Sequence, residues 1–201
     1  MTAPLLAISR HRLAVDGNGV TTLVCFHGCP LRCHYCLNSE CWDPSRVWRV
    51  VSPEELLSLT VIDDLYFQAT GGGICFGGGE PLLRSAFIRD FCLQCPPEWT
   101  IYLESSLHVE NHHLQAVVPF ITHYYIDVKD MNPDIYRRYT GQSPEFLLTN
   151  LQWLADQKMQ PKVTIRLPLI RDYNTEADRE RSRLQLESLG FTDFDLFEYV
   201  C

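Results

Sequence analysis

Three cysteines are the residues whose type and spacing point most directly to chemistry. Cys29, Cys33 and Cys36 are separated by three and then two residues and follow a short apolar run. Thiolates at such intervals on one loop can each bind a different iron of a single iron–sulfur cube. Because an electron-transfer cluster normally takes four protein ligands, three cysteines predict a cluster with one iron open to a small molecule.

The spacing alone leaves other interpretations of this loop open. Cys41 or His34 could supply a fourth ligand to the cluster. A structural zinc site is also compatible with the cysteines, with its fourth ligand coming from elsewhere in the chain. A non-catalytic zinc or iron–sulfur binding module is therefore the alternative to an enzyme.

A glycine run that ends in a carboxylate is the second chemical feature. Gly77, Gly78 and Gly79 precede Glu80 and Pro81. Glycines at a strand end let the backbone approach a ligand closely, and a glutamate offers its carboxylate to a cation such as an ammonium group. Such a run on its own is typical of a tight turn into a helix. Beside the cysteine loop, it favours a site for an ammonium group.

Alternating strands and helices must position these residues. Short apolar runs predict six strands, at residues 20–26, 72–76, 100–103, 123–128, 163–167 and 194–198. Amphipathic segments predict five helices, at residues 52–59, 83–93, 110–118, 144–157 and 176–189. This order requires parallel strands with crossover helices, so the fold class is α/β.

The length of the chain limits the kind of α/β fold. A complete eight-unit barrel takes about 250 residues, whereas this chain has 201. We therefore predict an incomplete (βα)6 TIM-like barrel of parallel strands, with an open doubly wound sheet as the alternative. The whole chain, residues 1–201, is expected to form a single domain.

Charged residues near the ends of predicted strands mark where a ligand would bind. Glu104, Asp127, Lys129 and Arg166 alternate with apolar neighbours. A parallel sheet covered on both faces is apolar throughout, so these charges predict a polar cleft at the carboxyl edge of the sheet. Ion pairs at the sheet margin are the alternative explanation.

Composition narrows the class of protein further. The chain is 46% hydrophobic and 21% charged, with a formal net charge of -8. It is therefore globular, and its charge opposes binding to nucleic acid or to an anionic membrane. Nine cysteines without a secretory leader indicate the reducing cytoplasm. No apolar run approaches the roughly 18 residues that a membrane span requires.

Taken together, these motifs resemble those of a known family. Cys-x3-Cys-x2-Cys with an aromatic residue before the last cysteine looks like the cluster loop of the radical S-adenosylmethionine (SAM) superfamily. The runs at residues 15–20 and 26–33, with Asn38, resemble more narrowly the activating enzymes of glycyl-radical enzymes, of the pyruvate formate-lyase activating type. The resemblance extends from about Val15 to Tyr199.

This resemblance implies an oxidoreductase and its cofactors. Cys29, Cys33 and Cys36 would hold a 4Fe-4S cluster whose fourth iron binds the amino and carboxylate groups of S-adenosylmethionine. One electron, from a flavodoxin or ferredoxin-type donor, would cleave the cofactor to methionine and a 5′-deoxyadenosyl radical. That radical would remove a hydrogen atom from a glycine of a partner glycyl-radical enzyme under anaerobic conditions.

The resemblance also assigns cofactor-binding residues. Gly78, Gly79 and Glu80 would hold the amino group of S-adenosylmethionine. Tyr35 would present its backbone and ring to the adenine. Arg166 would approach the cofactor carboxylate, which a guanidinium can bind in bidentate fashion.

Two further strand ends complete the implied site. Glu104 and Ser105 stand where family members have Asp-Thr, and Asp127 and Lys129 match their Leu-Asp-x-Lys strand. The resemblance places a monovalent cation at Glu104 and Asp127, beside the cofactor carboxylate, with Ser105 and Lys129 along the cofactor. Glu104 is one methylene longer than the aspartate of the family.

Some positions depart from the family pattern. Asn18, Thr21 and Leu37 stand where the family usually has proline, arginine and histidine or glutamine. Glu198 occupies the place of a histidine near the cofactor, and we assign it to cofactor binding. Asp16, near the cluster loop, is expected to contact the incoming glycine loop. The alternative substrates are an anaerobic ribonucleotide reductase or a small molecule, because enzymes of both kinds in this superfamily are comparably short.

Overall fold

Six parallel strands form most of one eight-stranded sheet in the computed structural model, which describes residues 1–199. The strand order is β3-β1-β2-β4-β5-β6-β7-β8. The strands are β1 (Ala3–Leu13), β2 (Val20–Phe26), β3 (Arg49–Val51), β4 (Gly73–Gly78), β5 (Thr100–Ser105), β6 (His123–Asp127), β7 (Val163–Leu169) and β8 (Phe194–Glu198). Pairing is parallel from β2 through β8, and β3 and β8 are separate edges. The predicted incomplete barrel is confirmed.

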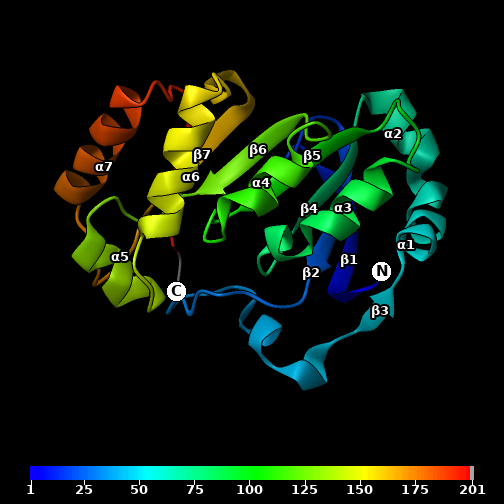
Figure 1. Ribbon diagram of the computed structural model, residues 1–201, viewed down its shortest axis with the longest axis horizontal. Coiled ribbons are helices and arrows are strands. Elements are labelled where there is room, and N and C mark those ends of the chain that lie inside the picture. Colours follow the sequence, from blue (N-terminus) through cyan, green and yellow to red (C-terminus); the bar gives the residue numbers. More distant parts are fainter. Residues whose placement is uncertain (200–201) are drawn as a thin grey trace.

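Helices connect the parallel strands. They are α1 (Pro53–Thr60), α2 (Asp64–Thr70), α3 (Ser85–Cys92), α4 (Asn111–Val117), α5 (Pro133–Thr140), α6 (Glu145–Asp156) and α7 (Glu176–Ser188). In Figure 1, α5, α6 and α7 lie at one end of the sheet and α1 and α2 at the other. Across the described residues, no helix combines the length and the apolar character needed to cross a bilayer.

The sequence patterns missed four elements, β1, β3, α2 and α5. In β1, polar residues interrupt the apolar ones, and many of its positions are only partly buried. The strand pairs antiparallel with both β2 and β3, so it lies outside the βα repeat. In α5 the apolar content is low, but Asn132 caps the helix by accepting from the N–H groups of Asp134 and Ile135. Local capping therefore starts a helix that hydrophobic periodicity does not reveal.

Strand alternation separates the apolar core from the polar interior of the open barrel. On β6, Tyr124 and Ile126 are fully buried, whereas Tyr125 and Asp127 on the opposite face are half-buried. Phe26 and Phe76, on the neighbouring strands β2 and β4, have ring centroids 5.8 Å apart within the core. The predicted period-2 pattern on this strand is confirmed, and it directs the charged side chains away from the core.

Candidate cofactor site

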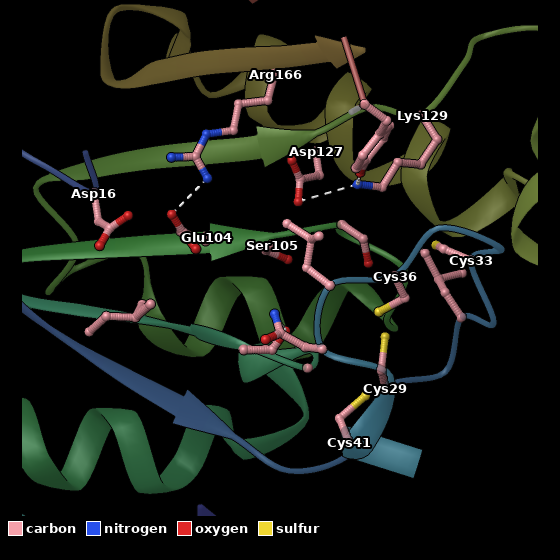
Figure 2. A pocket seen from close by; sticks show the side chains of 18 of the residues that line it. Asp16, Cys29, Cys33, Cys36, Cys41, Glu104, Ser105, Asp127, Lys129 and Arg166 are labelled. Atoms are coloured by element: carbon pink, nitrogen blue, oxygen red, sulfur yellow. Dashed lines mark hydrogen bonds and ion pairs between the residues drawn. The ribbon is translucent and has the colours of Figure 1, made fainter. Parts of the chain in front are cut away.

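A cavity of about 520 Å³ runs through the inside of the open barrel. Cysteines of the loop after β2 line one end, and charged side chains from β1, β5, β6 and β7 line the other. Figure 2 shows this arrangement, with Cys29, Cys33 and Cys36 on one loop and Asp16, Glu104 and Arg166 at the opposite end. The loop and the strand ends therefore share one binding space.

The cluster loop, residues 27–42, is held in place by its backbone. The N–H of Gly28 donates to the carbonyl of Cys41 over 3.0 Å, and the N–H of Arg32 donates to the carbonyl of Thr140 over 2.8 Å. The Arg32 guanidinium also donates to the carbonyl of Cys29 at 2.8 Å. These contacts fix the loop against α5 while Cys29, Cys33 and Cys36 line the cavity.

The donor set fits a cluster better than a single metal ion. Within residues 1–199, no group of three or more His, Cys, Asp or Glu side chains is placed to hold one ion. A cube-shaped cluster needs its cysteines apart, because each binds a different iron. Burial raises the pKa of Cys33 to about 11 and also raises the pKa of Cys36. These thiols therefore become ligands only when a bound cation offsets the cost of the thiolate charge.

The structure separates the two proposed fourth ligands. Cys41 is buried and lines the cavity next to Cys29. The pKa of Cys29 is raised mainly by a hydrogen bond between the two thiols and, to a smaller extent, by burial. His34 is exposed, does not line the cavity, and packs against Tyr173 with ring centroids 5.4 Å apart. Of the two, only Cys41 is placed near the cysteine motif on the cavity side.

The glycine turn at the end of β4 lies directly against the cluster loop. The N–H of Gly79 donates to the carbonyl of Phe26 over 2.9 Å, and the N–H of Glu80 donates to the carbonyl of Gly28 over 2.8 Å. A Cβ on Gly79 would come within 2.2 Å of the Gly28 carbonyl oxygen, and Gly78 has φ +93°. Only glycine permits this close approach. Gly78 and Gly79 also line the cavity, so the two motifs form one continuous wall.

Glu80 is buried behind this wall. Its carboxylate accepts hydrogen bonds from the Ser105 hydroxyl at 2.7 Å, from the N–H and hydroxyl of Ser106 at 2.9 and 2.7 Å, and from the N–H of Leu82 at 3.1 Å. Burial outweighs these bonds and raises the pKa of Glu80. The carboxylate therefore joins the glycine turn to the end of β5, and Ser105 rather than Glu80 lines the cavity. A direct contact of Glu80 with an ammonium group stays a prediction.

The charged strand ends form ion pairs inside the cavity. Arg166 donates to Glu104 over 2.6 Å, and Lys129 Nζ lies 3.4 Å from the Asp127 carboxylate. Burial raises the pKa of Glu104, and this effect exceeds the opposing influence of Arg166. Both interpretations of these charges therefore hold, because the residues line a polar cleft and also pair with one another. The two carboxylates expected at a monovalent cation each have a basic partner.

Asp16 lies on the turn between β1 and β2, which forms the floor of the cavity. It is 2% exposed and is bound by the Arg12 guanidinium, with one N–H donating over 3.0 Å. The N–H of Asn18 donates to the hydroxyl of Tyr102 on β5 over 3.0 Å, and this bond holds the turn against that strand. Asp16 is thus placed inside the site, opposite the cluster loop.

Three predicted residues, Tyr35, Glu80 and Glu198, do not line the cavity, whereas Tyr199 lines it without having been predicted. Tyr35 packs its ring against Tyr139 and Tyr173, at 6.2 and 6.0 Å between centroids. Glu198 is exposed and borders a separate recess. Tyr199, one position further, lines the main cavity, and its hydroxyl accepts from Lys129 Nζ over 3.1 Å. The period-2 alternation along β8 could have indicated this exchange.

Comparison with known proteins places this geometry in a family. The sequence profile of the Radical SAM superfamily matches residues 23–182, from β2 into α7. The chain belongs to this superfamily. Its members use a 4Fe-4S cluster and S-adenosylmethionine, and these are the cofactors of the chain. The (2S)-3-sulfopropanediol dehydratase activating enzyme of Klebsiella oxytoca is 34% identical over 149 residues, which cover 72% of this chain and 46% of that protein.

A second relative and one solved structure are also similar to this chain. The pyruvate formate-lyase 1-activating enzyme of Escherichia coli (strain K12) is 29% identical over 167 residues, covering 82% of this chain and 67% of that protein. The radical SAM chain thus spans about half the length of the first relative and about two thirds of the second. SuiB of Streptococcus suis aligns over 87% of this chain and 38% of its own with a TM-score of 0.64 and 10% identity, which shows the shared fold alone.

Proposed function

We propose that this radical SAM chain activates a glycyl-radical enzyme. The support is twofold: the two relatives named above are activating enzymes, and one cavity holds both the cysteine loop and the glycine turn. The second observation carries the cofactor-cleaving part of the proposal, because cleavage requires the open iron and the cofactor amino group to be adjacent; the relatives support the choice of substrate. The direct hydrogen bonds of Gly79 and Glu80 to the strand end and loop support that adjacency.

Residues on the cluster loop and the glycine turn would hold the cofactors. Cys29, Cys33 and Cys36 would bind the cluster, and the backbone of Gly78 and Gly79 would face the amino group of S-adenosylmethionine. When bound, the cluster and S-adenosylmethionine supply one-electron cleavage of a sulfonium, which ends in removal of a hydrogen atom from the substrate. The chain orients the cofactor and excludes water from it.

Residues at the strand ends would complete the cofactor site. Ser105 and Lys129 line the cavity between the cysteines and the charged floor, a place suited to the cofactor's length. Arg166 would attract the cofactor carboxylate while remaining paired with Glu104. We propose that Arg166 and Lys129 supply the positive charge for which a monovalent cation at Glu104 and Asp127 was expected.

For Tyr35 and Asp16 we propose contacts with the adenine and with the partner's glycine, respectively. Tyr35 reaches the adenine through its backbone, since its ring packs among tyrosines. Asp16, on the cavity floor and paired with Arg12, would meet the glycine of the partner when that glycine enters the cavity. We propose that Tyr199, rather than Glu198, lies beside the cofactor.

The cellular setting belongs to the same proposal. A one-electron donor of the flavodoxin or ferredoxin type would reduce the cluster, in an anaerobic cytoplasm and without a nucleic-acid or membrane partner. The 201 residues would act as one radical SAM domain. A different protein or small-molecule substrate is the second candidate, because the chain spans only 46% of its sulfopropanediol relative.

An anaerobic reconstitution separates these possibilities. The chain is loaded with iron and sulfide, reduced photochemically, and given S-adenosylmethionine. We expect formation of 5′-deoxyadenosine and, when a glycyl-radical enzyme is added, a glycyl radical in the electron paramagnetic resonance spectrum. Cofactor cleavage with no radical on any such enzyme would favour another substrate. No cleavage at all would favour the binding module.

Matched cysteine variants identify the ligands in the same experiment. Cys33→Ser is expected to lose most of the cluster absorbance, because Cys33 is one of three ligands. Cys41→Ser is expected to retain it, although Cys41 lies only five residues beyond Cys36 and lines the same cavity. Loss of the cluster in Cys41→Ser would instead make Cys41 a fourth ligand and would contradict the open iron.

A further inference from the structure

Arginines that lack a carboxylate partner gather around the cluster loop. Among the described residues, nine of the arginines form ion pairs within 4.0 Å. The remaining arginines are Arg32, Arg49, Arg84, Arg137 and Arg138. Four of these five adjoin the loop, and Arg49 lies on the edge strand β3. This is unexpected in a chain with a formal net charge of -8.

Three of these arginines form one exposed surface, called here the arginine surface: Arg32, Arg137 and Arg138. The cluster loop packs on the last turn of α5, because the N–H of Arg32 donates to Thr140 over 2.8 Å. Arg137 and Arg138 belong to that turn. All three side chains are exposed, so their charges face solvent beside the cysteine motif.

The positive character of this surface is more than a helix-end effect. Basic residues in the last turn of a helix are favoured by its dipole, which accounts for Arg137 and Arg138. It does not account for Arg32, which lies on the loop with its guanidinium 4.9 Å from the centre of the Trp42 ring. The nearby acid on the same helix is Asp134, in its first turn. Glu40 of the cluster loop is already paired with Arg46. The three arginines therefore outweigh the one unpaired carboxylate of the loop and α5.

The arginine surface lies outside the cavity. Cys29, Cys33 and Cys36 line the cavity, whereas Arg32, Arg137 and Arg138 do not. A substrate must enter the cavity to be reached by a reactive cofactor, but an electron can cross the loop from its outer side. Arg32 directly precedes Cys33 in the chain. A protein bound here would therefore approach the cluster from the outer side of the loop, which faces away from the cavity.

We propose that the arginine surface docks an acidic one-electron carrier protein, an inference that rests on the proposed radical SAM function. Charge complementarity selects the partner, because an acidic surface is attracted by three guanidinium groups that have no carboxylate partner and is repelled by the rest of this acidic chain. The transfer is balanced: the carrier loses one electron, as a flavin hydroquinone does on becoming a semiquinone, and the cluster gains it. Docking itself requires no bond to form or break.

Binding of a flavodoxin, as the acidic probe, tests the docking surface directly. The reconstituted chain is compared with Arg137→Glu, because the Arg137 side chain forms no ion pair in the described structure and is exposed. We expect about tenfold weaker binding of flavodoxin to the variant at low salt, and a difference that shrinks at about 0.5 M salt. The readout is calorimetric, so it does not depend on turnover.

Lys162→Glu is the matched control. It makes the same change of charge at an exposed residue that directly precedes β7, at the end of the sheet opposite the cluster loop. We expect flavodoxin binding to change by less than about twofold. Equal weakening by both variants would show a general charge effect and overturn the proposal. Weakening of the glycyl-radical partner's binding instead of flavodoxin binding would assign the surface to the substrate protein and also overturn it.

Photochemical reduction distinguishes failure of docking from failure of the proposed function. A photoreduced deazaflavin needs no protein surface, so Arg137→Glu should cleave S-adenosylmethionine at the wild-type rate with that reductant and more slowly with reduced flavodoxin. Slower cleavage with both reductants would place Arg137 in the cofactor site and contradict the docking surface. No cleavage by the wild-type chain with deazaflavin would refute the radical SAM activity, while the binding comparison would still decide the surface.

Discussion

Arg166 and Glu104 form an ion pair across an intervening strand. Their side chains meet at 2.6 Å, although Arg166 belongs to β7 and Glu104 to β5, with β6 between them. The guanidinium passes over the ring of Tyr125 on β6, with its carbon 4.6 Å from the ring centre. Arg166 also donates to the carbonyl of Val15 over 3.2 Å. This arrangement fixes a positive charge beside two carboxylates in the cavity.

We expect cofactor binding to be independent of monovalent cations for this reason. Glu104 and Asp127 already face Arg166 and Lys129, so a metal cation would have to displace a paired side chain. The dissociation constant of S-adenosylmethionine should therefore differ by less than about twofold between potassium chloride and choline chloride. Isothermal calorimetry on the reconstituted chain measures it.

Arg166→Gln should make that binding depend on the cation. The substitution leaves the partly buried Glu104 carboxylate without its partner, which is costly. A potassium ion could then restore part of the lost affinity, whereas choline is too large to do so. A wild-type chain that binds the cofactor much more weakly in choline would contradict this explanation and would return Glu104 and Asp127 to the role of cation ligands.

Replacing Glu80 should weaken both the fold and cofactor binding without removing the cluster. Glu80→Ala leaves four hydrogen-bond donors without their acceptor: the buried donors of Leu82 and Ser105 and the two partly buried donors of Ser106. We expect a loss of about 2–4 kcal/mol in the free energy of unfolding. Urea denaturation measures this loss, and calorimetry measures cofactor affinity.

Glu80→Gln is the conservative companion to that variant. Its amide oxygen still accepts, so it should lose less stability than Glu80→Ala, while its iron content should match that of the wild type in both variants. If Glu80→Ala were as stable as the wild type but failed to bind the cofactor, the carboxylate would act on the ammonium group itself rather than through the wall of the cavity.

Tyr199 should contribute more to cofactor binding than Glu198. Tyr199→Phe keeps the ring but removes the hydroxyl that accepts from Lys129 over 3.1 Å. Lys129 is buried, so a lost partner at its ammonium group is expected to reduce cofactor affinity by about threefold to tenfold. Glu198→Gln alters an exposed residue and should change affinity little. The opposite order of the two effects would support the residue that the sequence indicated.

The order of strands and the cysteine and glycine motifs could be predicted because they rest on local patterns. Six short apolar runs correspond to β2 and β4 to β8. The motif residues Cys33 and Gly79 line the predicted cavity. These features depend on hydrophobic alternation and on backbone space at a glycine, both of which can be seen in a few adjacent residues.

Pairing between side chains could not be predicted from those patterns. Glu104 and Arg166 are distant in the sequence, and nothing near either residue shows that they meet. Glu80 faces two serines because β4 and β5 end side by side, which depends on register. Glu198 was assigned from the family resemblance, whereas Asp195, Phe197 and Tyr199, in the opposite phase of the strand alternation, line the cavity. Local patterns therefore indicated which residues gather at the cavity better than which side chains contact one another there.

Acid should destabilise the chain through one buried and two partly buried histidines. Burial lowers the pKa of His108, His113 and His123 below the usual value of 6.5. The unfolded chain therefore takes up protons near that pH while the folded chain does not. Their contribution to stability is present above pH 6.5 and is lost as the pH falls through the folded pKa values.

His108 offers the clearest test of this effect. It is 7% exposed and packs against Phe146, with ring centroids 5.4 Å apart, and burial is the cause of its shift. Urea denaturation at about pH 7.5 and about pH 5.5 should show a smaller loss of stability in His108→Gln than in the wild type, because glutamine does not titrate. His112→Gln changes an exposed neighbour and should keep the wild-type loss. An equal loss in His108→Gln and the wild type would show that other groups cause the acid sensitivity.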